Sequence, residues 1–594
     1  MRTIPLRTAR TENISLNADC NKQPRVNPVT GYLHGSFDRP PFFSVNGSPV
    51  TIRGRFRPDA PPTFRAIAIT SLLLGTAGPS SAQVVEVLPP APVIDRVDIT
   101  TENVFSEEEI RKNWIFRLMN GIRFDTRPGV VRKELLFGPG STLDSAQLAE
   151  TERNLRRLRI FRRVDVDTVT RNDSLLVKVK TRDAWSTQPI FSFSFSGETL
   201  TGRVGLSEQN LFGTGNQAKV AWRKSVDRNA LELETRFRRV FGSQIDVSGL
   251  YFGLTDGDVG AWYMGDPWRS AEDRREIGYG GDISNRRIPR YRVLSESVTD
   301  TTMYRYRGFG HTVSFGVAPT ARSGRYTRLI VEGAIRNDRF LFEDDTASVL
   351  APPDSVKGWI GGRVETRSDR FEVFQYLNGF SQEDVNLSPH ASAGIRLAPA
   401  AFGYDRDGIG LIGTAGTGAR TGPVYLRVDL RANALFTTVG VDSGRVVVNL
   451  SAAAKPARKH AILLGAYGGI LENPPPGSEF DLGFEPAPRS FDPHSFVGTK
   501  AVSGTVEYRW YLWDSLLGLF GLGIAGFLDY GGAWYPDQES RWGGNVGIGL
   551  RTGSARGSGA GTGRIDFGYR FGPDVSGSGG DRWALSLGTG FTFF

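Results

Sequence analysis

The side chains that could carry out covalent chemistry are few and far apart in this sequence. Cys20 is the only cysteine, which excludes an intramolecular disulfide and a cysteine-rich zinc site. His494 lies close to Asp492 and Ser495, but all three fall in one proline-containing loop, and no G-x-S-x-G motif accompanies them. The sequence therefore predicts neither an enzyme nor a metal or other cofactor site. The histidines, which show no metal-ligand spacing, are His34, His311, His390, His460 and His494.

Two glycine-rich segments match the letters of a dinucleotide-binding motif. They are "GTGNQA" at residues 213–218 and "GLGIAG" at residues 521–526. A dinucleotide site needs these glycines between a strand and a helix, and neither segment is followed by a helical pattern. The first segment predicts a turn between strands, and the second lies within a strand.

The net charge of +9 is unevenly placed along the chain. Residues 1–82 hold ten Lys and Arg against four Asp and Glu, so only about +3 remains for the rest. No run of basic residues interleaved with aromatic residues occurs. The composition therefore gives no reason to expect a nucleic-acid partner.

Residues 1–82 predict an N-terminal extension and a cleaved signal peptide. Arginines precede an apolar run at about 66–78, and small residues follow up to Ala82, where cleavage is expected. The run is shorter than the ~20 residues of a membrane-spanning helix, and a short buried helix is the alternative. Because this signal begins some fifty residues into the chain, we hypothesise that translation starts near Val50 on a non-AUG codon. Cys20 would then be absent from the mature protein.

Residues 93–183 predict a small α/β module. Ser106 and Glu109 form a capping box at the start of its first helix. The last helix carries a leucine face, and its arginines, Arg153, Arg156, Arg157 and Arg159, predict a solvated face. The expected order is strand 93–100, helices 106–119, 127–136 and 144–161, and strands 163–169 and 174–181.

Residues 186–594 alternate between polar and apolar residues in sixteen to nineteen strand-like segments. In "RIDFGYRF" (564–571) and "VYLRVDLRANALF" (424–436), the polar face carries both signs of charge. The apolar faces of such segments also carry Trp and Tyr, as in "TVEYRWYLW" (505–513). Polar residues toward a wet lumen and apolar residues with interfacial aromatics toward lipid are typical of a transmembrane β-barrel. A secreted all-β protein is the alternative.

The last twelve residues predict the strand that closes the barrel. In "WALSLGTGFTFF" (583–594), alternate residues share an apolar face, and Phe594 falls on the opposite face. An amphipathic last strand that ends in aromatic residues is what a barrel offers to outer-membrane assembly machinery. The residues assigned to this role are Trp583, Leu585, Leu587, Phe591, Phe593 and Phe594.

The order of these parts resembles the bacterial surface antigen family, a superfamily of outer-membrane assembly factors and two-partner secretion transporters. The resemblance covers roughly residues 93–594 and implies one POTRA module before an antiparallel transmembrane barrel of 16 strands. "ERNLRRLRIFRRVDV" (152–166) is similar to the helix-to-strand passage of the module. "EQNLFGTGNQ" (208–217) is similar to the N-L-x-G-x-G motif at the start of the barrel, with Asn210, Gly213 and Gly215 in the motif positions.

The resemblance also assigns a loop that folds back into the lumen. "RSFDPHSFVGTKAVSGTVEYR" (489–509) is similar to this loop and the strand that follows it, where the family carries R-G-F/Y. This chain has Arg489, Ser490 and Phe491, so a serine replaces the family's glycine. Carried over, Arg489 would pair with Asp529 of "FLDYGG" (527–532), with Glu507 as a second partner. Such charge-assisted hydrogen bonds would lock the loop inside the barrel.

The function implied by the resemblance is insertion of other barrel proteins into the outer membrane, with the module in the periplasm. The module would receive an unfolded client strand by β-augmentation. The seam between the first strand, near 188–198, and the last, 583–594, would then template the client. The implied partners are unfolded outer-membrane proteins, the lipid bilayer, and periplasmic chaperones and lipoproteins. A polypeptide exporter of the same superfamily, usually with two modules and a plug helix, and a passive channel are the alternatives.

Overall fold

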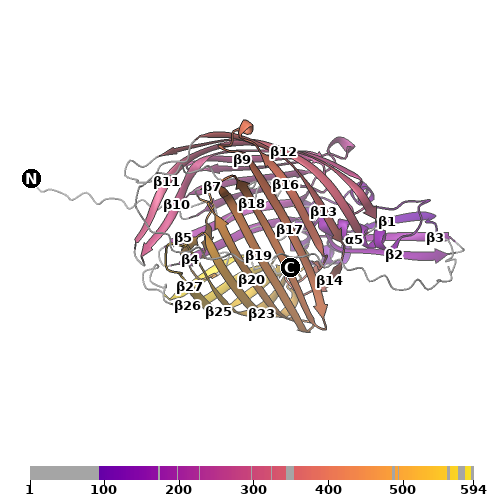
Figure 1. Ribbon diagram of the computed structural model, residues 1–594. Coiled ribbons are helices and arrows are strands. Elements are labelled where there is room, and N and C mark those ends of the chain that lie inside the picture. The colour runs from indigo at the N-terminus through magenta and orange to yellow at the C-terminus, as the bar shows by residue number, and fades with distance from the viewer. Residues whose placement is uncertain are drawn as a thin grey trace, which may run out of the picture.

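The computed structural model describes a small α/β module followed by a large barrel (Figure 1). The expected signal peptide and the aromatic residues Phe591, Phe593 and Phe594 lie outside the described residues. The described residues are 92–171, 174–196, 199–225, 228–295, 298–322, 324–342, 354–475, 477–483, 488–491, 494–557, 562–572 and 582–589.

The module is a three-stranded sheet covered by helices. The sheet has the order β1-β3-β2, with β1 parallel and β2 antiparallel to β3. Leu155 and Leu158 at the end of the last helix are buried against the sheet residues Val177 and Val179. The strands are β1 Arg96–Glu102, β2 Phe161–Arg171 and β3 Ser174–Asp183, and the helices are α2 Glu107–Lys112, α3 Trp114–Ile122, α4 Pro128–Lys133 and α5 Ser145–Arg157.

The helices of the module end earlier than the sequence predicts, and the one expected at 127–136 ends at Lys133. The capping box is confirmed, because Ser106 N donates to Glu109 Oε2 at 2.8 Å and Glu109 N donates to Ser106 Oγ at 3.3 Å. The helix breaks at Asn113, whose side chain accepts from Ile115 N at 2.9 Å and begins a second helix. The helix expected to reach residue 161 ends at Arg157, since Arg159 adopts a positive φ of 57°.

The barrel is antiparallel and closed, but it has twenty strands in the described residues instead of the expected sixteen. The expected number of sixteen strands was implied by the resemblance to the bacterial surface antigen family. The count of alternating segments was also low, because glycine-rich strands such as β17, "GIGLIGTAGTGART", show little alternation of side chains while their backbones pair fully. A hydrogen-bonded ladder needs only the backbone groups, so such strands leave a weak pattern in the sequence.

The barrel strands follow one another around the wall in chain order. The first ten are β4 Thr187–Ser196, β5 Thr199–Leu211, β6 Asn216–Lys224, β7 Asn229–Phe237, β8 Asp246–Leu254, β9 Gly257–Asp266, β10 Arg275–Ser295, β11 Val298–Arg322, β12 Arg325–Phe342 and β13 Ser355–Ser368. The others are β16 His390–Ala398, β17 Gly408–Thr421, β18 Val424–Thr437, β19 Gly440–Ala457, β20 His460–Glu472, β23 Lys500–Leu516, β24 Phe520–Trp534, β25 Gly543–Ser554, β26 Gly563–Phe571 and β27 Trp583–Thr589. Two short 3-10 helices, η2 Val240–Gly242 and η3 Ala400–Phe402, lie in connections between strands.

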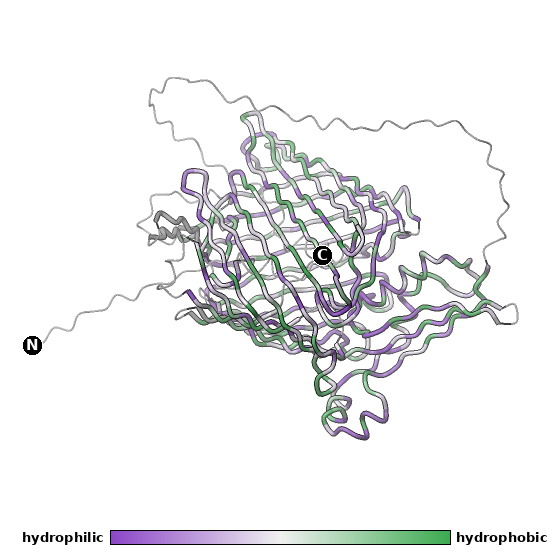
Figure 2. Tube along the Cα trace, turned by 90° about the horizontal axis from the view of Figure 1, so that it is seen from below, coloured by the Kyte–Doolittle hydropathy of each residue, from purple (hydrophilic) through white to green (hydrophobic). Residues whose placement is uncertain are grey.

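The outer face of the barrel is apolar, and the inner face is polar. In β26, Ile565 and Phe567 are 38% and 46% exposed, whereas Arg564, Asp566 and Arg570 on the other face are almost fully buried. Figure 2 shows hydrophobic and hydrophilic residues alternating along the barrel strands. A wall that exposes large apolar side chains outward and encloses charged ones matches a bilayer outside and a polar lumen inside. The protein is a transmembrane β-barrel.

Among the described residues, no helix is long and apolar enough to cross a membrane.

Two β-hairpins lie outside the ladder of the wall and come from opposite ends of the barrel. The end of the barrel where β12 begins is the one that carries the module, because Asp369 N donates to Gly324 O at 2.6 Å and the Asp369 carboxylate accepts from Arg153 of α5. The hairpin of β14 (Phe371–Gln375) and β15 (Gln382–Asn386) follows β13 and therefore starts at this module end. The pair β21 (Phe480–Leu482) and β22 (Phe496–Gly498) follows β20 and starts at the far end.

The turn between β5 and β6 holds the module against the barrel. Asn210 Nδ2 donates to Thr126 Oγ1 at 2.9 Å, and Asn210 Oδ1 accepts from Gly215 N at 2.9 Å. Arg127 N donates to Gly213 O at 3.0 Å. Gly213 has a φ of 70°, and a Cβ atom there would lie 2.1 Å from Asp125 O. The three residues expected at the start of the barrel thus form the contact between the barrel and the module.

We predict that Gly213→Ala loosens the module from the barrel. The left-handed backbone costs an alanine about 1–2 kcal/mol, and the methyl group would also collide with Asp125 O. Gly422→Ala is the matched control, because Gly422 has a φ of 58° in a similar turn with no atom within 4 Å of its Cβ position. The measurement is the rate of proteolysis within 92–186 in liposomes. Equal rates for the two variants would contradict the prediction.

Candidate functional site

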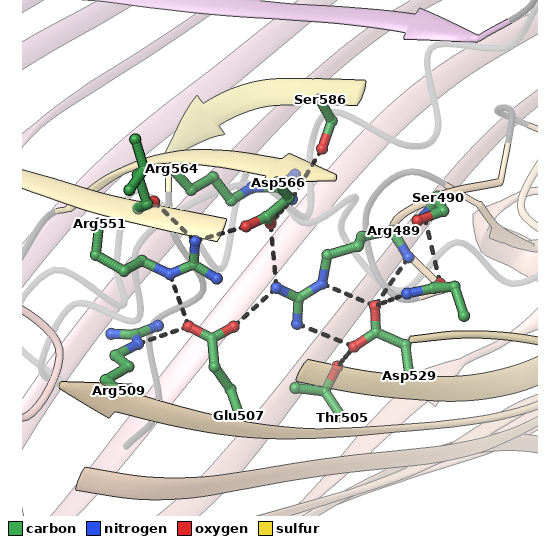
Figure 3. Close-up of polar contacts among 12 residues, drawn as sticks. Arg489, Ser490, Thr505, Glu507, Arg509, Asp529, Arg551, Arg564, Asp566 and Ser586 are labelled. Atoms are coloured by element: carbon green, nitrogen blue, oxygen red, sulfur yellow. Dashed lines mark hydrogen bonds and ion pairs between the residues drawn. The ribbon is translucent and has the colours of Figure 1, made fainter. Parts of the chain in front are cut away.

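Arg489 lies inside the barrel and is held by three carboxylates. Its Nε and Nη2 donate to the two oxygens of Asp529 at 2.7 and 2.9 Å, and its backbone N also donates to Asp529 at 3.2 Å. Its Nη1 donates to Glu507 at 2.7 Å and to Asp566 at 3.2 Å (Figure 3). The three acids come from β23, β24 and β26. Arg489 belongs to the connection between β20 and β23, which we call the far-end loop. One side chain of this loop therefore joins three strands of the wall.

Asp529 has two further partners on the wall. Thr505 Oγ1 donates to Asp529 Oδ1, and Asn545 Nδ2 donates to Asp529 Oδ2 at 3.0 Å. The Arg489 guanidinium also lies 4.0 Å from the centre of the Phe527 ring. Asp529 therefore has donors from the loop, from its neighbouring strands and from the Arg489 backbone.

Further arginines of the wall complete this group. Arg509 Nε and Arg551 Nε donate to Glu507 Oε1 at 2.7 and 2.8 Å. Asp566 accepts from Arg551 Nη1 at 2.5 Å and from Arg564 Nη1 at 2.8 Å. Buried charges are tolerated when they are paired and hydrogen-bonded, as they are here. We call this group the lumen charge cluster; its members are Arg489, Glu507, Arg509, Asp529, Arg551, Arg564 and Asp566.

Ser490 fits the position where the family carries a glycine. Its backbone is not among those with positive φ in the described residues, so a serine is not strained here. A Cβ atom on Gly568 would lie 2.2 Å from Ser490 Oγ, so the wall has a glycine where the loop has the extra side chain. Ser490 O accepts from Arg570 Nε at 2.5 Å. The serine is therefore accommodated by the wall of the barrel.

The rest of the far-end loop packs against the inner wall. Phe491 and Phe496 are buried with their ring centres 5.1 Å apart. A Cβ atom on Gly543 would lie 2.5 Å from Phe491, so this glycine provides the space for the ring. His494 Nδ1 lies 2.6 Å from Asp481 Oδ2 within the same loop. The contact between His494 and Asp481 ties the loop to itself.

The β14–β15 hairpin enters the lumen from the module end. Leu377 and Val385 pack among buried wall residues of β18, β19 and β20. Arg509 Nη1 donates to Asn378 O at 3.0 Å, and Tyr511 Oη donates to Leu377 O at 2.8 Å. Phe380 occupies the space over Gly521, where a Cβ atom would lie 2.3 Å away. The sequence analysis missed this insertion, although Asn378 and Gly379 between two short strand-like segments form a hairpin signal.

The same hairpin is tied to the module. Arg156 of α5 donates two hydrogen bonds to the carboxylate of Asp384, at 2.8 and 2.7 Å. Arg153 lies 4.6 Å from the centre of the Phe371 ring and 3.4 Å from Asp369. The solvated face predicted for α5 is therefore wrong, because Arg153 and Arg156 are largely buried against the hairpin. Because Arg509 contacts both the hairpin and Glu507, the contacts run from α5 to the lumen charge cluster.

A second set of contacts joins the module to the barrel rim. Arg556 donates to Glu109 Oε1 at 2.5 Å and to Gly518 O at 2.8 Å. The hydrogen bond from Arg556 lowers the pKa of Glu109 to about 2. Glu150 Oε1 accepts from Ala271 N at 2.8 Å, and burial raises the pKa of this carboxyl group. The module is thus fixed at several turns around the same end of the barrel.

The seam between β27 and β4 has the shortest ladder of the barrel in the described residues. It joins three residue pairs, Leu585↔Phe195, Ser586↔Ser194 and Leu587↔Phe193. The ladders on either side join seven pairs between β26 and β27 and ten between β4 and β5. Trp583 and Leu585 face outward as expected, 52% and 42% exposed. Between the described residues, the seam therefore has fewer residue pairs than the ladders on either side.

No protein-family model and no curated protein matches this chain. Its fold is similar to BamA from Haemophilus ducreyi lacking POTRA domains 1–3, with 11% identity, a TM-score of 0.36 and coverage of 83% of this chain and 84% of that chain. CdiB from Escherichia coli is 11% identical, with a TM-score of 0.40 and coverage of 86% of this chain and 93% of that chain. CdiB from Acinetobacter baumannii is 11% identical, with a TM-score of 0.39 and coverage of 84% of this chain and 90% of that chain.

We predict that Arg489→Ala strongly destabilises the barrel, because it leaves Asp529 buried without its main cation. Removing one partner of a buried ion pair typically costs ~3–5 kcal/mol. Arg489→Lys should also destabilise it, since a single ammonium group cannot reach all three carboxylates. The measurement is the temperature at which the folded band disappears in heat-modifiable gel migration.

The control is Arg420→Ala, which removes a half-exposed arginine paired with Glu372. A surface pair of this kind contributes ~0–1 kcal/mol, so the folded band should persist to nearly the original temperature. Equal losses for Arg489→Ala and Arg420→Ala would show that the lumen charge cluster does not hold the barrel together.

Proposed function

We propose that this protein assists the insertion of other β-barrel proteins into the outer membrane, with its module in the periplasm. The observation that carries the proposal is the seam, where β27 and β4 share only three described residue pairs, in the half of β4 that lies away from the module. Parting this ladder would expose two strand edges whose N–H and C=O groups can pair with a new strand.

The module is placed to deliver a strand to that seam. β4 follows β3 of the module after only residues 184–186. Trp185 N donates to Arg556 O at 2.8 Å, so this short linker also contacts the segment after β25. In the three-stranded sheet, β2 is an edge strand that pairs with β3 alone in the described residues. An extended client segment would add to this edge by β-augmentation and would then lie next to the seam.

The contents of the lumen support assembly over passive conduction. The far-end loop and the β14–β15 hairpin enter the barrel from opposite ends and are anchored by buried contacts. Arg509 contacts both the hairpin and Glu507, which in turn binds Arg489 of the loop. A passive channel needs an open lumen, whereas an insertion factor uses its wall and can keep its lumen filled.

Polypeptide export is the second candidate function. The observation that favours it is the hairpin itself, because a removable plug inside the lumen is what an exporter would need. The sequence predicts no plug helix before the module, but the β14–β15 hairpin occupies the lumen from within the barrel. Export would require breaking the contacts of Leu377 and Asn378 with β23.

The test is reconstitution of residues 83–594 in liposomes with an unfolded model barrel protein. We expect the client to fold several-fold faster, by heat-modifiable gel migration, than in liposomes that carry an equal amount of a passive porin. A rate equal to that of the porin liposomes would overturn the proposal. Client that reaches the liposome interior protected from protease, but unfolded, would instead favour export.

A further inference from the structure

Helix α3 exposes three large apolar side chains beside the barrel. Trp114, Leu118 and Ile115 are 70%, 59% and 37% exposed. Residues four apart on a helix are neighbours, so Trp114 and Leu118 form one patch with Ile115 at its border. Soluble surfaces rarely gather such residues without a partner. The opposite side of the helix is buried through Phe116, which is 6% exposed.

The position of α3 is fixed by its buried side. The Phe116 ring stacks on Phe105 with 5.0 Å between their centres, and the Arg556 guanidinium lies 4.7 Å from the centre of the Phe116 ring. A Cβ atom on Gly518 would lie 3.0 Å from Phe116, so the helix rests directly on the turn between β23 and β24. Leu519 of the same turn packs against this group. The exposed patch therefore cannot turn inward without breaking these contacts.

The lipid-facing surface of the barrel continues down to this same turn. Trp513 and Leu516 of β23 are 54% and 45% exposed, Leu517 in the turn is 79% exposed, and Phe520 of β24 is 54% exposed. Aromatic residues gather where a barrel crosses the membrane interface, and Trp513 follows Tyr508 and Trp510 on the outer face of β23. The apolar band thus reaches the barrel rim at the place where α3 is attached.

The charges near the patch balance one another. Arg111 lies 3.7 Å from Glu107, and Lys112 pairs with Glu108. Glu109 forms an ion pair with Arg556. With Arg117 as the remaining charge of this region, α2 and α3 present no strongly basic surface to anionic lipids. Binding of this region to a bilayer would therefore depend on burial of apolar side chains.

We propose that α3 lies in the membrane interface, with Trp114 and Leu118 inserted among the headgroups and acyl chains of the leaflet on the module side. The bilayer surface then covers the patch and is continuous with the lipid around β23 and β24. This contact holds the first part of the module at the membrane. It depends on the barrel spanning a membrane and holds whether or not the protein inserts clients.

The test is the depth of a nitroxide spin label on the full chain in phosphatidylethanolamine–phosphatidylglycerol vesicles. The label is attached at Leu118→Cys in a Cys20→Ser background, and Glu107→Cys on α2 is the control because its side chain is 93% exposed. Collisions with O₂, which concentrates in lipid, are compared with collisions with a water-soluble nickel chelate. We expect the O₂-to-nickel ratio at position 118 to be several-fold higher than at position 107.

Three results would contradict the proposal. Equal ratios at the two positions would place the patch in water. Shielding of the label from both reagents would show that protein, either a second copy or a client, covers it. Ile115→Cys serves as a second label site if Leu118→Cys does not give a folded band by heat-modifiable migration. Replacing phosphatidylglycerol with phosphatidylcholine should leave the ratio unchanged, and a large fall would contradict a contact based on apolar burial.

Discussion

The structure depends on one constraint, which is that each charge enclosed by the barrel must be paired and hydrogen-bonded. Arg489, at 1% exposure, has no access to water that could replace Asp529, Glu507 and Asp566. Charges removed from water remain stable only when partners of opposite sign and hydrogen bonds replace the solvent. The far-end loop must therefore fold into the lumen, because only this loop brings Arg489 between β23, β24 and β26.

This constraint makes the wall uneven in strength. β23 to β26 are joined by long ladders and also by the side chains of the lumen charge cluster. In the described residues, the cluster reaches β27 through Arg564 Nη1, which donates to Ser586 Oγ at 3.4 Å. Beyond β27, three residue pairs join β27 to β4 in the described residues. The proposed opening of the seam would leave the long ladders from β23 to β26 closed.

The sequence predicts the β-barrel and the polar face of each strand well, but it predicts poorly which side chains pair across neighbouring strands. Strict alternation in "RIDFGYRF" indicates which face is polar, because strand side chains alternate regardless of neighbours. Pairing of Arg489 with Asp529 and Glu507 was expected only from the family resemblance. The alternation of polar and apolar residues correctly places Asp566 and Arg551 on the polar faces of their strands. Whether these two side chains meet depends on the register between β25 and β26, which a single sequence does not specify. Glycine-rich strands and the β14–β15 hairpin were missed because short or side-chain-poor strands leave little pattern.

The most direct test of seam opening is a disulfide across the seam. A Cβ atom on Gly588 would lie 3.6 Å from Ser192 Cβ, which is within the range for a disulfide. The variant Ser192→Cys/Gly588→Cys of residues 83–594, which contain no native cysteine, is compared in its oxidised and reduced forms in the client-folding assay. If the seam opens during insertion, the oxidised protein stays folded but loses its acceleration of client folding, and reduction restores it. Full acceleration by the oxidised protein would contradict the account.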